Sequence, residues 1–243
     1  MQKSTKSLLA LALIVLVVFS ADTVLLFQSK PAVDKDTLFQ VAAFNTFSMG
    51  NYTGVMTYSE LGKHGDFGIG TFDGLNGEMI ALNGVFYQIP SDGVPREVNA
   101  SMTAPYATVT YFHVDQTFTV SNLNYTQLKT RIDDALTSQG VIYAIKVTGT
   151  FGYAQTRSPA KQTQPYPLLA DALKTQSIFN LNSVSATAAG FWFPSNMNGV
   201  DYAGYHLHLI TDDHSAGGHM LDCIIQNATV EIEHINNYRL ILP

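Results

Sequence analysis

The sequence predicts an α+β fold with mixed, mostly antiparallel β-sheets and a few short helices. Short apolar runs separated by Asn-Gly and Asp-Gly turn signals fill most of the chain. A helical spacing of apolar residues occurs in only two segments. The tripeptide Gly70–Phe72 recurs as Gly149–Phe151, each at the expected end of a strand, and this echo suggests an internal duplication.

The part of the chain before residue 121 is predicted to form strands and turns. Leu38–Phe47 is apolar and fits either a helix or a strand. Asn83-Gly84 lies between MIAL and VFYQI, which is the signal for a two-residue hairpin. Ala107–Val120 is rich in β-branched and aromatic residues and therefore predicts one strand or a pair of strands.

The two helical segments lie in the second half. Apolar residues recur at intervals of three and four in Tyr125–Ser138, and Gly140 supplies an end signal. Pro167–Phe179 shows a second helical pattern. Val141–Phe151 is predicted to be a strand, and the chain from residue 183 to residue 242 has a β-like pattern.

The N-terminal segment resembles a targeting signal. MQKSTKS carries two lysines, and an apolar stretch follows from Leu8 to Phe27. This pattern predicts a signal peptide or an uncleaved membrane anchor over residues 1–27, and hence an exported chain that is secreted or tethered outside the cytoplasm. Residues 28–243 then form the functional domain, with two sheet subdomains expected at about 28–140 and 141–243.

Composition excludes some classes of function. The net charge is −6, only 13% of the 243 residues are charged, and no Lys/Arg cluster occurs beyond the N-terminus, so nucleic acid is not an expected partner. Cys223 is the only cysteine. An intrachain disulfide and a cysteine-based zinc site are therefore excluded, and any metal must be bound by histidines and carboxylates.

Four of the seven histidines lie in GYHLHLITDDHSAGGHMLD. His206 and His208 alternate on a predicted strand and leave it on one face. Gly217-Gly218 can return the chain so that His219 lies beside them, whereas His214 falls at the solvated tip. Three imidazoles without a thiolate are typical of an open, catalytic metal site, with zinc as the default and copper, nickel or iron as alternatives. The competing interpretation is surface alternation on a hairpin.

This run, together with GTFDGLNGEMIALNGVFYQ, YAIKVTGTF and RSPAKQTQPYPLL, resembles the α-acetolactate decarboxylase family, in order from Gly70 to Asp222. The resemblance implies a homodimer. It also implies roles for six residues: zinc ligands His206, His208 and His219, a glutamate at the metal site, Glu78, a pocket threonine, Thr71, and a catalytic arginine, Arg157.

Decarboxylation of 2-acetolactate requires groups of this kind: a Lewis acid, a cationic side chain and a group that transfers a proton. Loss of CO2 leaves an electron pair on a carbon next to a ketone, and a Lewis acid chelated by the substrate hydroxyl and ketone stabilises the resulting enediolate. Protonation then gives acetoin. We expect Arg157 to bind the carboxylate and the enediolate, and Glu78 or a water molecule to relay the proton.

One departure and two alternatives remain. The family carries a further glutamate beyond its C-terminal strand, for which the sequence up to Pro243 shows no match, and Glu231 and Glu233 are left unassigned. The chain could instead be a non-catalytic extracellular module that binds a metal or another ligand. A cupin-like barrel is less consistent, because no glutamate lies between His208 and His219.

Overall fold

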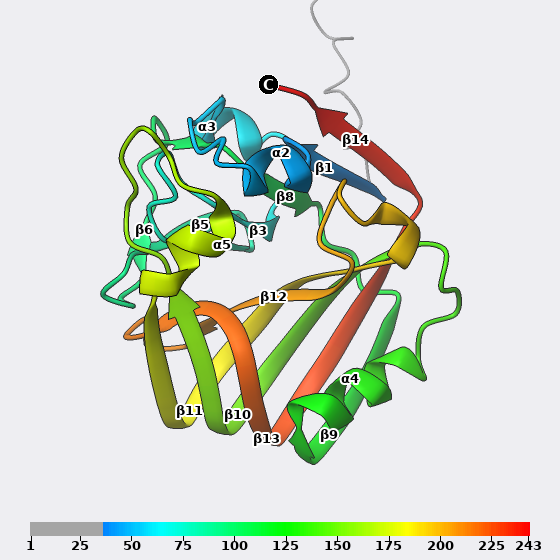
Figure 1. The fold of residues 1–243 in the computed structure, drawn as a ribbon. Coiled ribbons are helices and arrows are strands. Elements are labelled where there is room, and N and C mark those ends of the chain that lie inside the picture. The colour runs from blue at the N-terminus through cyan, green and yellow to red at the C-terminus, as the bar shows by residue number, and fades with distance from the viewer. Residues whose placement is uncertain (1–35) are drawn as a thin grey trace, which may run out of the picture. The chain divides into compact units, whose positions relative to one another are not determined.

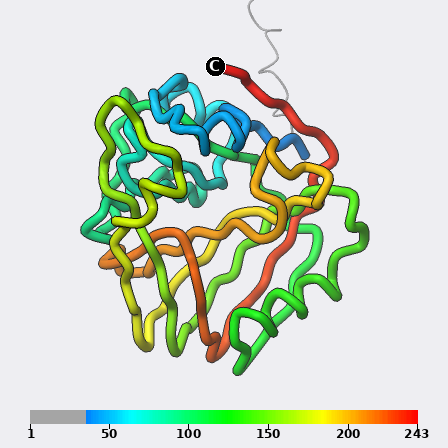
Figure 2. Tube along the Cα trace, viewed as in Figure 1, coloured from blue at the N-terminus to red at the C-terminus, as the bar shows by residue number. Residues whose placement is uncertain are grey.

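Two β-sheets pack against each other and contain most of the regular structure (Figure 1). The computed structural model describes residues 36–243. The chain path shows one sheet built mainly from the earlier part of this range and the other mainly from the later part (Figure 2). The pairings are antiparallel with one parallel exception among the named strands, and the helices are short, so the predicted α+β class is confirmed.

The first sheet has seven strands in the order β14, β1, β8, β3, β4, β5 and β6, with β1 and β14 parallel. A separate two-stranded sheet joins β2 to β7. The bounds of these strands are Thr37–Val41 (β1), Met56–Thr57 (β2), Phe67–Thr71 (β3), Glu78–Leu82 (β4), Val85–Ile89 (β5), Arg96–Glu97 (β6), Thr103–Ala104 (β7), Ala107–Thr110 (β8) and Asn237–Ile241 (β14).

The second sheet is made of long, bent strands. One edge of β13 pairs with β10, while the other edge pairs first with β12 and then with β9. Because β11 joins β10 to β12, strands β10 to β13 close into a ring. The bounds are Gln116–Asn124 (β9), Ile142–Ser158 (β10), Ser177–Phe193 (β11), Gly204–Thr211 (β12) and Gly217–Ile235 (β13).

Short helices surround these sheets. The longest, α4, is capped by Asn124, whose side chain accepts a hydrogen bond from the backbone of Gln127 while the Gln127 side chain accepts one from the Asn124 backbone. The bounds are Phe44–Ser48 (α2), Tyr58–Leu61 (α3), Tyr125–Asp133 (α4) and Leu169–Ala172 (α5), with 3-10 turns at Leu173–Thr175 (η1) and Ser195–Met197 (η2).

Apolar side chains from both sheets meet in one cluster between them. Ile69 and Ile80 come from the first sheet, and Ala144 and Phe191 come from the second. Each is at most 1% exposed. Full burial of an isoleucine or phenylalanine side chain contributes roughly 1.5–3 kcal/mol. This packing holds β4 against β12, and these two strands carry much of the site described below.

Local turn chemistry was predicted well. The hairpin at Asn83-Gly84 is confirmed, because Leu82 pairs with Val85 and both turn residues have positive φ, +51° and +80°. The undecided segment Leu38–Phe47 contains both a strand and the start of a helix, because β1 ends at Val41 and α2 begins at Phe44.

Two sequence expectations were wrong in extent. Pro167–Phe179 is helical only over α5 and η1, and residues 177–179 already belong to β11, where pairing with β10 overrides the helical pattern. Gly149–Phe151 lies in the middle of β10 rather than at a strand end. It therefore does not correspond in position to Gly70–Phe72 at the end of β3, and the echo does not mark equivalent elements.

The described residues, 36–243, belong to one compact unit. The strands of the two sheets exchange across the expected boundary near residue 140, since β9 belongs to the second sheet and β14 to the first. The division into two sheet subdomains, at about 28–140 and 141–243, stays a prediction. No helix within residues 36–243 is long and apolar enough to cross a membrane. The predicted signal peptide or anchor over residues 1–27 lies outside the described residues.

Glu233 is a buried carboxylate where the two sheets meet. It pairs in register with Ala144 of the cluster between the sheets and is 0% exposed, and its oxygens have no hydrogen-bond partner of good geometry. Burial raises the pKa of Glu233 to about 8. The nearby backbone N–H of His113 lowers this pKa in part, while the charges of Asp115, Asp36 and Asp66 raise it.

This carboxylate makes the stability of the fold depend on pH between about 4.5 and 8. The folded chain holds the proton up to a pH of about 8, whereas the group in the unfolded chain releases it near 4.5. The contribution of protonated Glu233 to the free energy of unfolding is therefore fully present below about pH 4.5. It falls by up to about 1.4 kcal/mol per pH unit as pH rises, and it is lost once pH has passed the folded pKa. We expect Glu233→Gln, which is neutral and similar in shape, to be more stable than the unaltered chain by several kcal/mol at about pH 8.

Urea unfolding at acidic and alkaline pH measures this effect. The stability difference between Glu233→Gln and the unaltered chain should disappear near pH 4.5. Glu231→Gln is the matched control, because Glu231 lies two residues away and forms a partly exposed ion pair of 2.8 Å with Lys146. Loss of this ion pair should lower the free energy of unfolding by at most about 1 kcal/mol. If the stability difference between Glu233→Gln and the unaltered chain does not change with pH, Glu233 is not the group that takes up a proton on folding.

Candidate metal centre and cavity

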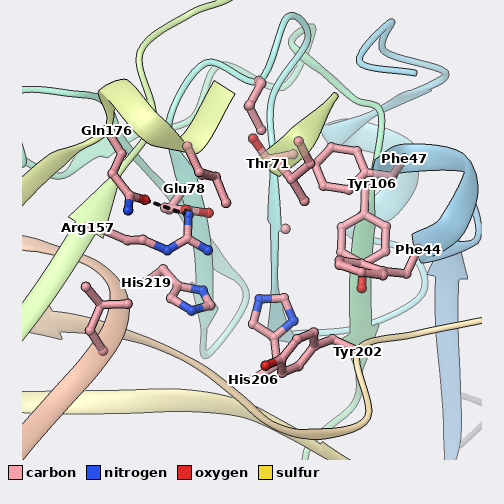
Figure 3. A pocket seen from close by; sticks show the side chains of 15 residues that line it. Phe44, Phe47, Thr71, Glu78, Tyr106, Arg157, Gln176, Tyr202, His206 and His219 are labelled. Carbon is pink, nitrogen blue, oxygen red and sulfur yellow. Dashed lines mark hydrogen bonds and ion pairs between the residues drawn. The ribbon is translucent and has the colours of Figure 1, made fainter. Parts of the chain in front are cut away.

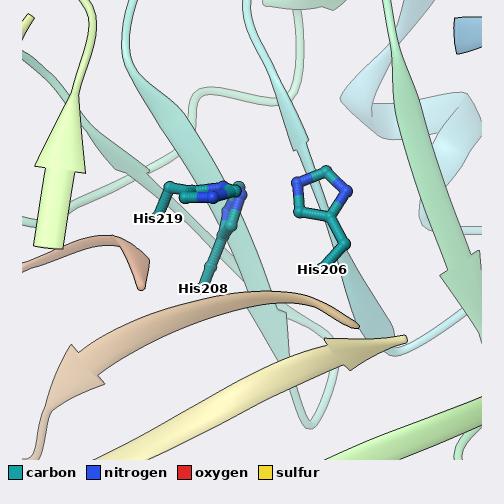
Figure 4. Close-up of side chains that lie close together, drawn as sticks. All are labelled: His206, His208 and His219. Carbon is teal, nitrogen blue, oxygen red and sulfur yellow. The ribbon is translucent and has the colours of Figure 1, made fainter. Parts of the chain in front are cut away.

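Three histidines converge beneath the first sheet (Figure 4). His206 and His208 leave the same face of β12, and His219 on β13 lies directly opposite His208 in the antiparallel pair. The three ring centroids are 5.1 to 5.3 Å apart. One ligand atom from each ring lies within 4.8 Å of the other two. The structure thus brings the three predicted ligands together, as an alternating strand and its returning neighbour require.

Several nitrogens of these rings have no hydrogen-bond partner among the described residues, as is expected at a site that binds a metal ion. His208 Nδ1 donates to the backbone carbonyl of Met79, at 2.7 Å, which leaves Nε2 as the free lone pair. His208 Nε2, His206 Nδ1 and His219 Nδ1 are all buried without a partner in the described chain. A buried polar atom left unpaired costs roughly 1–3 kcal/mol. A cation bound between the rings would accept the lone pair of His208 Nε2 and so remove this cost for that atom.

The charge state of the rings is also the one that metal binding requires. Burial lowers the pKa of His206 to about 3, with a further lowering from the positive charge of Arg157. The pKa values of His208 and His219 also lie well below the usual range, mainly because of burial. The imidazoles are therefore neutral near pH 7, which is the form that binds metals.

Glu78 and Arg157 lie beside the three rings. Glu78 opens β4 and is 7% exposed. One of its oxygens, Oε2, is 3.5 Å from His208 Nε2, and the other, Oε1, is 3.4 Å from Arg157 Nη1. Burial raises the pKa of Glu78 to about 7, although the positive charge of Arg157 opposes the shift. Arg157 reaches this position because it pairs in register with His219 across β10 and β13.

Thr71 is the last residue of β3 and pairs with Glu78. Its hydroxyl donates to the backbone carbonyl of Gly77, at 2.6 Å, and it is 2% exposed. The side chain thus supports the turn that leads into β4 and places Glu78. Thr71 also lines the cavity described next, and a contact with substrate stays a prediction.

A cavity of about 280 Å³ opens onto His206 and His219, with His208 buried behind them. It has a charged side, formed by Arg157 and Glu78, with the neutral side chain of Gln176 beside them (Figure 3). The opposite side is an aromatic wall, which consists of Phe44, Phe47, Tyr106 and Tyr202. The remaining lining residues are Gly70, Thr71, Leu75, Leu169, Leu173 and Leu221.

Sequence reasoning missed Gln176 and the aromatic wall. Gln176 Oε1 accepts a hydrogen bond from Arg157 Nη1, at 3.1 Å, and so helps to orient the guanidinium. These residues come from separate elements, and no local motif marks any of them. His214, predicted at the hairpin tip, is exposed there and packs beside the ring of Tyr87. Glu231 and Glu233, which were left unassigned, do not line the cavity.

The chain matches known proteins along most of its length. Residues 38–243 match the family model for alpha-acetolactate decarboxylase. The chain is 44% identical to the alpha-acetolactate decarboxylase of Methanosarcina mazei over 209 residues, which cover 86% of this chain and 73% of that protein. It is 37% identical to that of Bacillus subtilis over 207 residues, which cover 85% and 81% of the two chains.

Solved structures give the same result. The crystal structure of acetolactate decarboxylase from Bacillus subtilis subspecies spizizenii superimposes with a TM-score of 0.84 at 37% identity, over 85% of this chain and 90% of that one. A Staphylococcus aureus protein described as similar to alpha-acetolactate decarboxylase gives a TM-score of 0.84 at 30% identity, over 85% and 89%. The chain therefore belongs to the alpha-acetolactate decarboxylase family, whose members decarboxylate acetolactate.

Proposed function

We propose that the chain converts 2-acetolactate to acetoin and CO2 with a zinc ion held by His206, His208 and His219. The observation that carries the proposal is the convergence of one ring nitrogen from each histidine, all within 4.8 Å of one another, at a cavity that also contains Glu78 and Arg157. When bound there, zinc would supply a Lewis acid that stabilises the enediolate left by departing CO2. Nitrogen ligands of this type also accept other divalent metals, so zinc is the default assignment.

Arg157 is placed to bind the substrate carboxylate. Its hydrogen bonds to Gln176 and Glu78, within residues 36–243, both use Nη1. Nη2 and Nε can therefore form a bidentate pair with a carboxylate. When the carbon–carbon bond breaks, the carboxylate leaves as CO2 and its electron pair moves toward the neighbouring carbonyl. The guanidinium then balances the charge of the enediolate without losing its own proton.

Glu78 is the group best placed to move a proton. In the metal-free chain burial raises the pKa of Glu78 to about 7, above the usual range of a carboxyl group, which favours uptake of a proton for transfer. Its contact with Arg157 keeps it on the charged side of the cavity. Glu78, directly or through a water molecule, delivers the proton to the carbon that lost CO2, and the product is acetoin.

A turnover assay with metal removal tests the proposal. Purified protein is incubated with racemic 2-acetolactate, and acetoin and CO2 are measured before chelation, after chelation and after addition of zinc. We expect activity to disappear with the metal and to return with zinc. If about one metal ion binds per chain and neither product forms, the chain is instead a non-catalytic binding module. The buried Glu78–Arg157 pair at the cavity favours the enzyme.

We also propose that the chain is exported and forms a homodimer. Export rests on the two lysines and the apolar stretch from Leu8 to Phe27, and dimerisation rests on the family resemblance. Fractionation of cells that express the full chain distinguishes a secreted protein from a membrane-tethered one. Light scattering of the purified protein gives its mass in solution, and a monomer would contradict the second part.

A further inference from the structure

Tyr106 is the centre of the aromatic wall. Its ring stacks on Phe47 with centroids 4.9 Å apart and planes at 18°, and it meets Phe44 edge-on at 6.0 Å. Its hydroxyl donates to Asp201 Oδ1 at 2.7 Å. The ring is therefore fixed by aromatic packing and also by a hydrogen bond to a carboxylate, which is stronger than one between neutral groups.

Asp201 is a fully buried carboxylate that no step of the reaction uses. Besides Tyr106, its Oδ1 accepts the backbone N–H of Tyr202 at 2.6 Å, and its Oδ2 accepts the hydroxyl of Thr108 at 3.2 Å. Burial raises the pKa of Asp201 to about 7, while these three hydrogen bonds lower it. A buried carboxylate is tolerated only with such partners, so the donors and the acceptor hold one another in place.

The residues just before Asp201 also hold the helix that carries the rest of the wall. The carbonyl of Val200 accepts the backbone N–H of Phe44 at 2.8 Å and the side chain of Gln40 at 2.7 Å. The carbonyl of Gly199 accepts the backbone N–H of Asn45 at 3.0 Å. Gly199 has a φ of +92°, and a Cβ there would lie 2.5 Å from the Asn45 side chain. Segment 199–202 thus orders α2 and Tyr106 together.

We propose that Asp201 is a positioning residue that limits the size of the alkyl group the cavity accepts, because it holds Tyr106 rigidly against Phe47. The inference rests on the proposed function: with the substrate carboxylate at Arg157, its alkyl substituents face the aromatic wall. A rigid apolar wall discriminates against one extra methylene group by about 10- to 200-fold in kcat/KM. A ring freed from Asp201 can move, and the discrimination falls.

The test compares kcat/KM for 2-acetolactate with kcat/KM for the homologue that carries ethyl in place of methyl at C2. We expect Tyr106→Phe and Asp201→Leu each to reduce the preference for the methyl substrate by about tenfold, mainly through KM for the homologue. Asp201→Asn should retain the preference, since an amide oxygen accepts from Tyr106 and Tyr202 and the amide nitrogen can donate to Thr108. The double variant of Tyr106→Phe and Asp201→Leu should show no further loss.

Tyr205→Phe is the matched control. The Tyr205 hydroxyl also donates to a carboxylate, Asp133, at 2.5 Å, but its ring does not line the cavity. The inference is overturned if Tyr106→Phe keeps the full preference, or if Asp201→Asn loses it. These two variants decide the matter even if Asp201→Leu does not fold. If the unaltered chain forms no acetoin, the proposed function fails and this inference fails with it.

Discussion

Replacing His208 with alanine is expected to remove the metal and to abolish turnover. The substitution deletes the one ligand that is both buried and hydrogen-bonded to the backbone, and it leaves only His206 and His219 to bind. Because the Lewis acid supplies several kcal/mol of stabilisation, kcat should fall by roughly three orders of magnitude or more. Metal content by mass spectrometry and acetoin formation should be lost together.

His214→Ala is the matched control for that experiment. His214 belongs to the same hairpin but lies exposed at its tip, away from the cavity. Metal content and turnover of this variant should equal those of the unaltered chain. Activity that persists in metal-free His208→Ala would refute the role of the metal. A large loss in His214→Ala would show that the tip contributes to the site.

Glu78→Gln has the second largest expected effect, and it should separate metal binding from chemistry. The amide keeps the shape of the side chain but cannot exchange a proton near neutral pH. Positioned acid–base groups contribute roughly 10²- to 10⁴-fold to rate, so kcat should fall within this range. The three histidines stay in place, and metal content should therefore be retained.

Glu97→Gln provides the comparison, because Glu97 lies exposed on β6 outside the cavity. Its turnover should be unchanged. The assignment of Glu78 is wrong if Glu78→Gln keeps normal turnover with metal bound. Loss of metal in Glu78→Gln would instead indicate that the carboxylate is itself a required ligand.

The sequence was informative where a short range of residues determines geometry. The Asn83-Gly84 hairpin depends on the backbone freedom of two adjacent residues, and His206 and His208 share a face because side chains alternate along a strand. Both features are present in the structure. The family resemblance, in turn, named Glu78 and Arg157, which spacing alone does not distinguish from surface charges.

Sequence reasoning was weakest where contacts between distant segments decide the outcome. The helical pattern in Pro167–Phe179 gave way to pairing with β10 at residue 177. Gln176, Tyr106 and Asp201 reach the cavity or its wall from elements far apart in the chain, and none carries a local signal. Such placements depend on register between strands, and composition and periodicity do not specify it.

The partner of His208 Nδ1 is a main-chain atom, and this choice affects how the site can change. Every amino acid presents a carbonyl, so no substitution at Met79 can delete the acceptor while β4 keeps its path. Met79 is 0% exposed, and the constraint on this position is thus one of volume rather than of functional group. The orientation of the His208 ring is therefore insensitive to the identity of the side chain at position 79. The role of the neighbouring Glu78, in contrast, depends on its side chain and is lost when that residue is substituted.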